Sequence, residues 1–261
     1  MRTGMGPAEA QNGPVEIIVV AALAILVGSV LQRVSGTGVG LVVAPTLALL
    51  LGPATGVLVT NATTTVSGFL IMLSVWRHVD WRRFALIAPA AAVGAVPAAL
   101  VVRELPAAWL QVLVGGVVLL ALTTMFGLPR LPEWPGRLPT VLAGTIGGFF
   151  NTTAGVAGPV MVIHSRLARW EQRSFAATLQ PVFMTMGALS VLTKTLLGAA
   201  GTGGMPPWWV APGVVLTVVL GVRIGGVLAR RVPLSAARTT ALVLAGLGGA
   251  ITLVRGLLGV L

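Results

Sequence analysis

Residues 15–51 read VEIIVVAALAILVGSVLQRVSGTGVGLVVAPTLALLL, two apolar runs separated by a short glycine-rich segment at 35–40. The first run, 15–31, approaches the roughly 20 apolar residues that a helix needs to cross about 30 Å of hydrocarbon, whereas the second run, 41–51, is too short to cross untilted. Backbone that leaves a helix at membrane depth is tolerated only where protein or a water-filled cavity covers it. This stretch therefore predicts a membrane helix that is broken inside a bundle.

The composition of the whole chain also indicates a membrane protein. Of its 261 residues, 56% are hydrophobic and 9% are charged, with a mean hydropathy of +0.98, whereas soluble domains carry about 25% charged residues. A net charge of +11 would suggest nucleic acid in a soluble protein, but these arginines lie between apolar runs, so no nucleic-acid partner is expected. The absence of cysteine excludes disulfides and thiolate chemistry.

The apolar runs predict an all-α polytopic membrane protein with about 8–10 helical segments in a single transmembrane domain over residues 1–261, located in the cell membrane. Full-length candidate spans are 15–31, 55–76, 84–102, 107–126, 174–197, 208–229 and 235–254. Shorter apolar pieces are 41–51, 138–150 and 156–167. Because the short pieces need not cross the membrane, the number of full crossings stays open between about seven and ten.

Arginines are concentrated in alternate connections between the predicted spans. The basic connections are 77–83, 129–137, 166–173 and 230–238. By contrast, 52–54 and 198–207 carry no charge, and 103–106 carries one charge of each sign. Loops rich in lysine and arginine stay in the cytoplasm, so we place the four basic connections inside the cell and the other three outside.

The two halves of the chain resemble each other. Three landmarks recur in the same order at one constant offset, namely Trp81, Gly94 and Pro106, then Trp208, Gly221 and Pro233. Residues 35–40 also resemble residues 153–158. Chance alignment of glycine-rich sequence is the alternative, but matched connections fall on opposite sides of the membrane, which predicts two inverted-topology repeats over about 14–127 and 138–257. Such repeats commonly form transporters whose site lies near the midplane between broken or re-entrant helices.

Two motifs are similar to those of a known family. The sequence QRVSGTGVGLVVAP at 32–45 resembles the first signature of the sulfite exporter TauE/SafE family, and GGFFNTTAGVAGP at 147–159 resembles its second. The connection Val79-Asp80-Trp81-Arg82, followed by Gly94, also resembles this family. The chain departs from the signatures at Thr37, Val39 and Ala157. The resemblance implies a membrane transporter for sulfite or small organosulfur anions.

The glycine-rich breaks at 35–40 and 151–158 are the candidate binding site. Helix N-termini present free N–H groups and a partial positive charge, which favour an anion, and glycine allows a ligand to approach the backbone. Close packing of small residues, or a loop outside the membrane, is the alternative interpretation.

Polar side chains within the spans extend this site. Asn61 and Gln180 could donate hydrogen bonds to an oxyanion, whereas threonines commonly bond to carbonyls of their own helix. The residues predicted to bind substrate are Arg33, Ser35, Gly36, Thr37, Gly38, Gly40, Thr60, Asn61, Asn151, Thr152, Gly155, Gly158, Thr178 and Gln180.

Charged side chains within the spans are few. Arg33 precedes the first break, where it could bind an oxyanion through two N–H groups or extend to a lipid headgroup. Arg223 lies inside a predicted span, and a charge there usually marks function. Lys194 lies four residues before Gly198, and we expect it to extend to the membrane interface. His164, beside a basic connection, is expected to be structural or solvated.

No predicted span has a central carboxylate, which argues against cation transport and against a carboxylate proton relay. The sequence also contains no motif for a metal, cofactor or catalytic residue. Together with what the family resemblance implies, these absences lead us to expect a transporter that exports a small anion such as sulfite or an organosulfur or carboxylate anion. The alternatives are an intramembrane enzyme and a membrane assembly protein that does not transport. The expected partners are the anion and the lipid bilayer, and a homodimer is left open.

Overall fold

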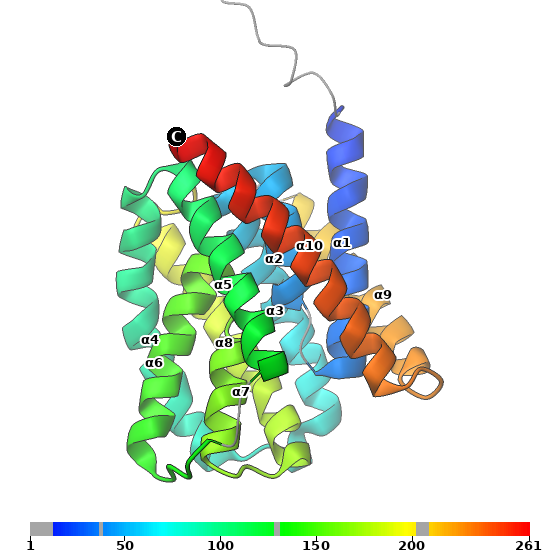
Figure 1. Ribbon diagram of the computed structural model, residues 1–261. Helices are drawn as coiled ribbons and strands as arrows, with labels where there is room; N and C mark the ends of the chain where they lie inside the picture. Colours follow the sequence, from blue (N-terminus) through cyan, green and yellow to red (C-terminus); the bar gives the residue numbers. More distant parts are fainter. Residues whose placement is uncertain (1–12, 37–38, 128–130, 202–208) are drawn as a thin grey trace, which may run out of the picture.

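The computed structural model describes residues 13–36, 39–127, 131–201 and 209–261, and within these ranges it contains ten α-helices, one 3₁₀ turn and no strand. The helices are arranged as one bundle (Figure 1). In chain order the elements are α1 (Pro14–Ser35), α2 (Val39–Leu51), α3 (Pro53–Val75), η1 (Trp76–His78), α4 (Trp81–Glu104), α5 (Ala107–Gly127), α6 (Arg137–Ala154), α7 (Gly158–Leu167), α8 (Gln172–Leu196), α9 (Val210–Leu228) and α10 (Leu234–Val260).

Seven of these helices are long and apolar enough to cross a membrane, namely α1, α3, α4, α5, α8, α9 and α10. They coincide with the seven full-length spans predicted from the sequence. The three short apolar pieces are α2, α6 and α7. The prediction of an all-α polytopic membrane protein with 8–10 helical segments is therefore confirmed.

Helices α6 and α7 form a hairpin that enters the bundle and returns to the same end. The N–H group of Trp134, before α6, donates to the carbonyl of Leu167, the last residue of α7, at 2.9 Å. Beside this contact, Arg169 forms an ion pair with Glu133 at 3.0 Å. At the other end of the hairpin, Ala154, Val156 and Ala157 are each at most 2% exposed. The tip of this hairpin is therefore inside the protein.

Helices α1 and α2 form a second hairpin, which enters from the opposite end (Figure 1). Ile25 of α1 packs in one cluster with Val39 and Val43 of α2. The tips of the two hairpins meet, because Gly40 near the start of α2 lies directly against the carbonyl of Gly155.

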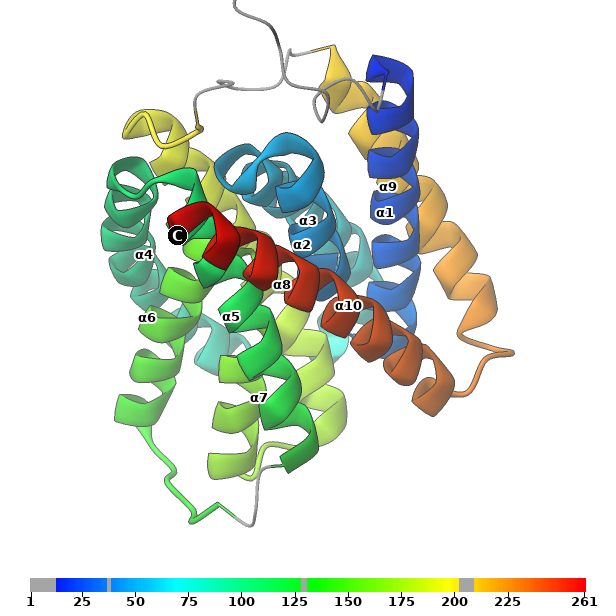
Figure 2. The same cartoon turned by 45° about the horizontal axis from the view of Figure 1, so that its top comes forward.

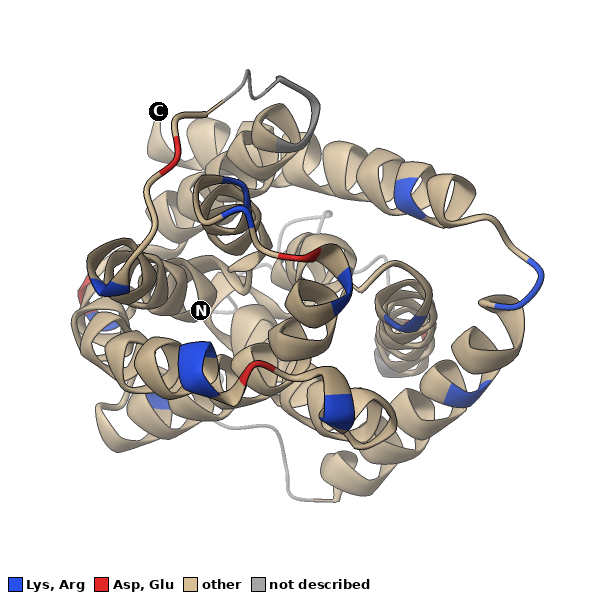
Figure 3. Ribbon diagram, turned by 90° about the horizontal axis from the view of Figure 1, so that it is seen from below, with Lys and Arg blue, Asp and Glu red and all other residues tan. Residues whose placement is uncertain are grey.

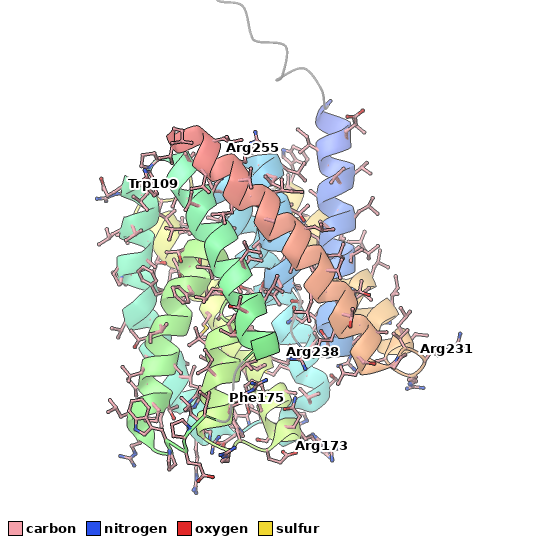
Figure 4. The ribbon with its side chains drawn as sticks, viewed as in Figure 1. Trp109, Arg173, Phe175, Arg231, Arg238 and Arg255 are labelled. Carbon is pink, nitrogen blue, oxygen red and sulfur yellow. The ribbon has the colours of Figure 1, made fainter. Side chains whose placement is uncertain are left out.

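The connections divide between the two ends of the bundle as predicted. Residues from the three weakly charged connections, among them Gly52, Arg103 and Gly198, line one cavity of about 370 Å³, which we call the outer cavity. Figure 3 shows arginines around the opposite end. In Figure 4, Arg173, Arg231 and Arg238 lie toward that end, whereas Trp109 and Arg255 lie at the other.

Local contacts hold the basic end together. The carboxylate of Glu171 accepts the N–H groups of Ser174 and Arg173 at 2.6 and 2.8 Å, which begins α8 and lowers the pKa of Glu171. The Arg83 guanidinium lies 4.3 Å from the centre of a Trp170 ring. Buried His164 packs against Trp170 with 5.9 Å between ring centroids, so it is not solvated.

Because the chain has no cysteine, single cysteines can report which end faces the cytoplasm. Ala107→Cys, after a weakly charged connection, and Gln172→Cys, in a basic connection, both replace exposed residues. We expect a membrane-impermeant maleimide to label Ala107→Cys in intact cells, and to label Gln172→Cys only after permeabilisation, because basic loops stay in the cytoplasm. Labelling of Gln172→Cys in intact cells would reverse the predicted orientation.

Candidate substrate site

A small cavity of about 30 Å³ lies where the two hairpin tips meet, and we call it the central cavity. Residues 39–41 of α2 and 155–158 at the α6–α7 break form much of its lining. Its other lining side chains, from α1, α3, α6 and α8, are Gln32, Thr64, Asn151 and Phe183. Segments far apart in the sequence therefore contribute to one site.

Helices α2 and α7 direct their N-termini at the central cavity. Helix α2 begins at Val39 and α7 begins at Gly158, and both residues line the cavity. The first N–H groups of a helix have no acceptor within the helix, and the aligned peptide dipoles give this end a partial positive charge. The two N-termini together favour a bound anion.

The preceding helices, α1 and α6, end with the same backbone cap. Gly36 and Gly155 adopt left-handed conformations with φ of 79° and 73°. Their N–H groups donate to the carbonyls of Gln32 and Asn151 at 2.8 and 2.9 Å. Glycine adopts this conformation without the steric penalty of a side chain. These caps stop both helices inside the bundle.

An asparagine pair fixes the end of α6 to α3. The side-chain amide of Asn61 donates to the backbone carbonyl of Asn151 at 3.0 Å and to the hydroxyl of Ser190 at 2.8 Å. In return, the amide of Asn151 donates to the Asn61 side-chain oxygen at 2.8 Å. Both asparagines are at most 2% exposed. Asn61 therefore fixes both the backbone and the side chain of Asn151.

A glutamine pair fixes the end of α1 to α8 in a similar way. The amide of Gln32 donates to the Gln180 side-chain oxygen at 3.1 Å, and its own oxygen accepts the Ser67 hydroxyl at 2.8 Å. The amide of Gln180 donates to the carbonyls of Gly36 and Ala176 at 3.3 and 3.2 Å. Gln180 therefore contacts both the side chain and the cap at the end of α1.

A count of amide hydrogens separates these four residues into two roles. A side-chain amide nitrogen carries two donor hydrogens. Asn61 and Gln180 use both hydrogens within the protein. In the described part of the chain, Gln32 and Asn151 each use one, and these two residues line the central cavity. Gln32 and Asn151 can therefore donate to a ligand, while Asn61 and Gln180 hold them in position.

One comparison with known proteins identifies a family. Residues 20–259 match the family model described as Sulfite exporter TauE/SafE. The chain belongs to the TauE/SafE family. Searches with the chain find no similar protein among curated proteins and no similar fold among solved structures.

Membership of the TauE/SafE family confirms the resemblance seen in the sequence motifs. Members of this family are cell-membrane transporters and not enzymes, in keeping with the seven candidate spans. The alternative of an intramembrane enzyme is therefore discarded.

The remaining predicted side chains of this TauE/SafE transporter lie in different environments. The hydroxyl of Thr152 is buried and has no hydrogen-bond partner within the described ranges. Thr60 and Thr178 donate to the carbonyls four residues earlier at 2.8 and 2.7 Å. Thr178 also accepts the N–H group of Asp80 at 2.8 Å, so it anchors a basic connection and does not line the central cavity.

The end of α1 is only partly directed at the central cavity. Arg33 donates to the hydroxyl of Ser74 at 2.7 Å, and Ser35 donates to the carbonyl of Leu31 at 2.7 Å. Neither side chain lines the central cavity. Thr37 and Gly38 lie outside the described residues. Among the predicted glycines, Gly40, Gly155 and Gly158 line the cavity, and Gly36 does not.

The expectation that Lys194 extends to the membrane interface is wrong. Its side chain is 0% exposed. The rotation of α8 is the reason, because Ser190, one turn earlier, faces α3 and bonds to Asn61, which turns Lys194 into the bundle as well. Arg223, by contrast, is exposed on α9.

Gln32, Ser67 and Ser190 were not predicted as site residues, although they belong to the hydrogen-bond network. One sequence signal could have found Gln32. It precedes Gly36 by four residues, just as Asn151 precedes Gly155. No comparable spacing marks the two serines.

The contact between Gly40 and the Gly155 carbonyl leaves no room for a methyl group. We expect Gly40→Ala to force the hairpin tips apart and to lower the free energy of unfolding by about 1–3 kcal/mol. Gly116→Ala on α5 is the matched control, because its added methyl group would meet nothing within 4 Å. Thermal melting in detergent measures both variants, and an unchanged melting temperature for Gly40→Ala would contradict the contact.

Proposed function

We propose that this TauE/SafE transporter exports a small oxyanion, either sulfite or a sulfonate or carboxylate of similar size, and binds it in the central cavity. The observation that carries this proposal is the convergence of two helix N-termini and two incompletely used amide groups on one cavity. Each of these groups offers a hydrogen-bond donor, and none of the lining residues is acidic. Such a site attracts an anion without repelling it.

Two inverted repeats build this site, the first contributing α1–α5 and the second α6–α10. Reciprocal contacts support the repeats. Gly68 of α3 lies against the carbonyl of Gln180, and Gly187 of α8 lies against the carbonyl of Asn61. Similarly, α4 packs beside α6 as α9 packs beside α1 (Figure 2).

The hydrogen bonds of the site also join each repeat to the other in matching positions. Gln32 pairs with Gln180, and Asn151 pairs with Asn61. These pairs align Gly36 of the first repeat with Gly155 of the second. The sequence motifs, which aligned residues 35–40 with 153–158, had placed Gly36 opposite Ala154.

The membrane potential alone can drive this export. The acidic residues within the described ranges lie at helix ends or in connections, and they are Glu16, Asp80, Glu104, Glu133 and Glu171. No carboxylate relay through the centre is therefore invoked. Moving one negative charge out of a negatively charged interior gains about 2.3 kcal/mol per 100 mV, close to a 50-fold concentration gradient.

The potential dependence can be tested in proteoliposomes that have sulfite on both sides of the membrane, with the higher concentration outside. We expect an interior-negative potential of about 100 mV, set with potassium and valinomycin, to drive sulfite out against a gradient of up to about 50-fold per charge moved. Liposomes without protein provide the background rate. Flux that ignores both the potential and an imposed pH gradient, or that prefers a cation, would contradict the proposal.

The two cavity amides provide a test of the binding site. Gln32→Ala and Asn151→Ala should each weaken sulfite binding by about 10- to 150-fold, since each removes a hydrogen bond to a charged ligand worth about 1.5–3 kcal/mol. Asn61→Ala and Gln180→Ala should also weaken binding, because they release the two cavity amides. Isothermal titration measures the affinities.

Gln172→Ala is the matched control, because it removes an amide that is exposed and remote from the cavity lining. Its sulfite affinity should equal that of the unmodified protein. Equal affinity in folded Gln32→Ala and Asn151→Ala as well would remove these residues from the proposed site.

A further inference from the structure

We propose that Lys194 forms a second anion-binding site between the central cavity and the outer cavity, where the exported oxyanion pairs with the lysine ammonium on its way out. This inference rests on the proposed function. It places a cation between the central cavity, whose lining offers neutral donors, and the outer cavity, which Arg103 lines. Three features of Lys194 support it.

The first feature is the position of Lys194 on α8. Gly187 and Ser190, two turns and one turn before it, both contact Asn61 of α3, through its carbonyl and its amide respectively. Residues three or four apart share one face of a helix. Lys194 therefore follows the central hydrogen-bond network along the face of α8 that is directed at α3.

The second feature is the outer cavity, which begins one turn beyond Lys194. The N–H group of Ala199 donates to the carbonyl of Lys194 at 2.7 Å, and Gly198 and Ala199 line the outer cavity. From α3, Thr55 lines the same cavity and donates to the carbonyl of Ala200 at 3.0 Å. Along α8, Lys194 thus lies between Ser190, which bonds to Asn61, and the residues that line the outer cavity.

The third feature is the absence of a partner for the ammonium. Among the described lysines and arginines, Lys194 alone is fully buried, and its Nζ atom has no hydrogen-bond partner there. The ion pairs within the same ranges involve other residues. Burial of an unpaired charge is strongly unfavourable. An oxyanion supplies both the opposite charge and acceptors for the three ammonium donors.

A purely structural role does not require this side chain. Methionine has a similar length and fills the same kind of space without a charge to bury. If Lys194 only filled space, its replacement by methionine would leave transport intact. If Lys194 binds the substrate, transport continues only when another cation takes its place.

The test compares sulfite flux in proteoliposomes containing the unmodified chain, Lys194→Met, Lys194→Arg and Arg255→Met. We expect Lys194→Met to reduce flux at limiting sulfite by at least about tenfold, with no fall in melting temperature. Lys194→Arg should retain more flux than Lys194→Met because it keeps the charge. Arg255→Met, which removes an exposed cation at the same end of the bundle, should transport at the unmodified rate.

The outcomes distinguish the two proposals. Flux through Lys194→Met at the unmodified rate overturns the role of Lys194 and leaves the central site intact. No sulfite flux through the folded, unmodified chain overturns the proposed function itself. If Lys194→Met does not fold, Lys194→Gln replaces it, because glutamine keeps a donor and loses the charge. Unmodified flux through Lys194→Gln overturns the inference, and a loss of at least about tenfold supports it.

Discussion

Backbone groups that leave a helix at membrane depth need hydrogen-bond partners, and this constraint organises the interior of the protein. At both breaks the protein supplies hydrogen-bond donors to the backbone carbonyls at the end of the preceding helix. The caps at Gly36 and Gly155 bond to the preceding turns, and the amides of Gln180 and Asn61 bond to the carbonyls of Gly36 and Asn151. The N–H groups at the starts of α2 and α7 instead face the central cavity. Because acceptors are satisfied and donors converge, this arrangement suits the anion site that we propose.

Close packing of small residues gives the two breaks their fixed geometry. Gly68 and Gly187 allow the backbones of α3 and α8 to touch, and Gly40 allows the two hairpin tips to touch. Backbone contact of this kind leaves little freedom for a helix to slide or rotate. The amides of Asn61 and Gln180, which come from the α3–α8 pair, can therefore hold Asn151 and Gln32 at defined positions beside the cavity.

The sequence was sufficient to predict the spans and the location of the breaks. Runs of apolar residues reflect the thickness of the bilayer, and glycine-rich polar segments within them reflect the need for unusual backbone conformations. Side-chain partners were not predictable in this way. The pairing of Gln32 with Gln180 joins residues 148 positions apart, and it depends on where the end of α1 meets α8. The burial of Lys194 likewise depends on the rotation of α8 about its axis, which the distance to the helix end does not reveal.

The size of the central cavity implies that transport requires movement. A volume of about 30 Å³ has room for about two water molecules, whereas sulfite has four heavy atoms. Widening the cavity means moving a hairpin away from α3 or α8, which breaks one of the two amide pairs. Two neutral hydrogen bonds join each pair across its break, and together they contribute about 1–3 kcal/mol net, comparable with the roughly 2.3 kcal/mol per 100 mV available to an exported charge. The potential that would drive export is therefore of the same order as the hydrogen bonds that hold each hairpin tip in place.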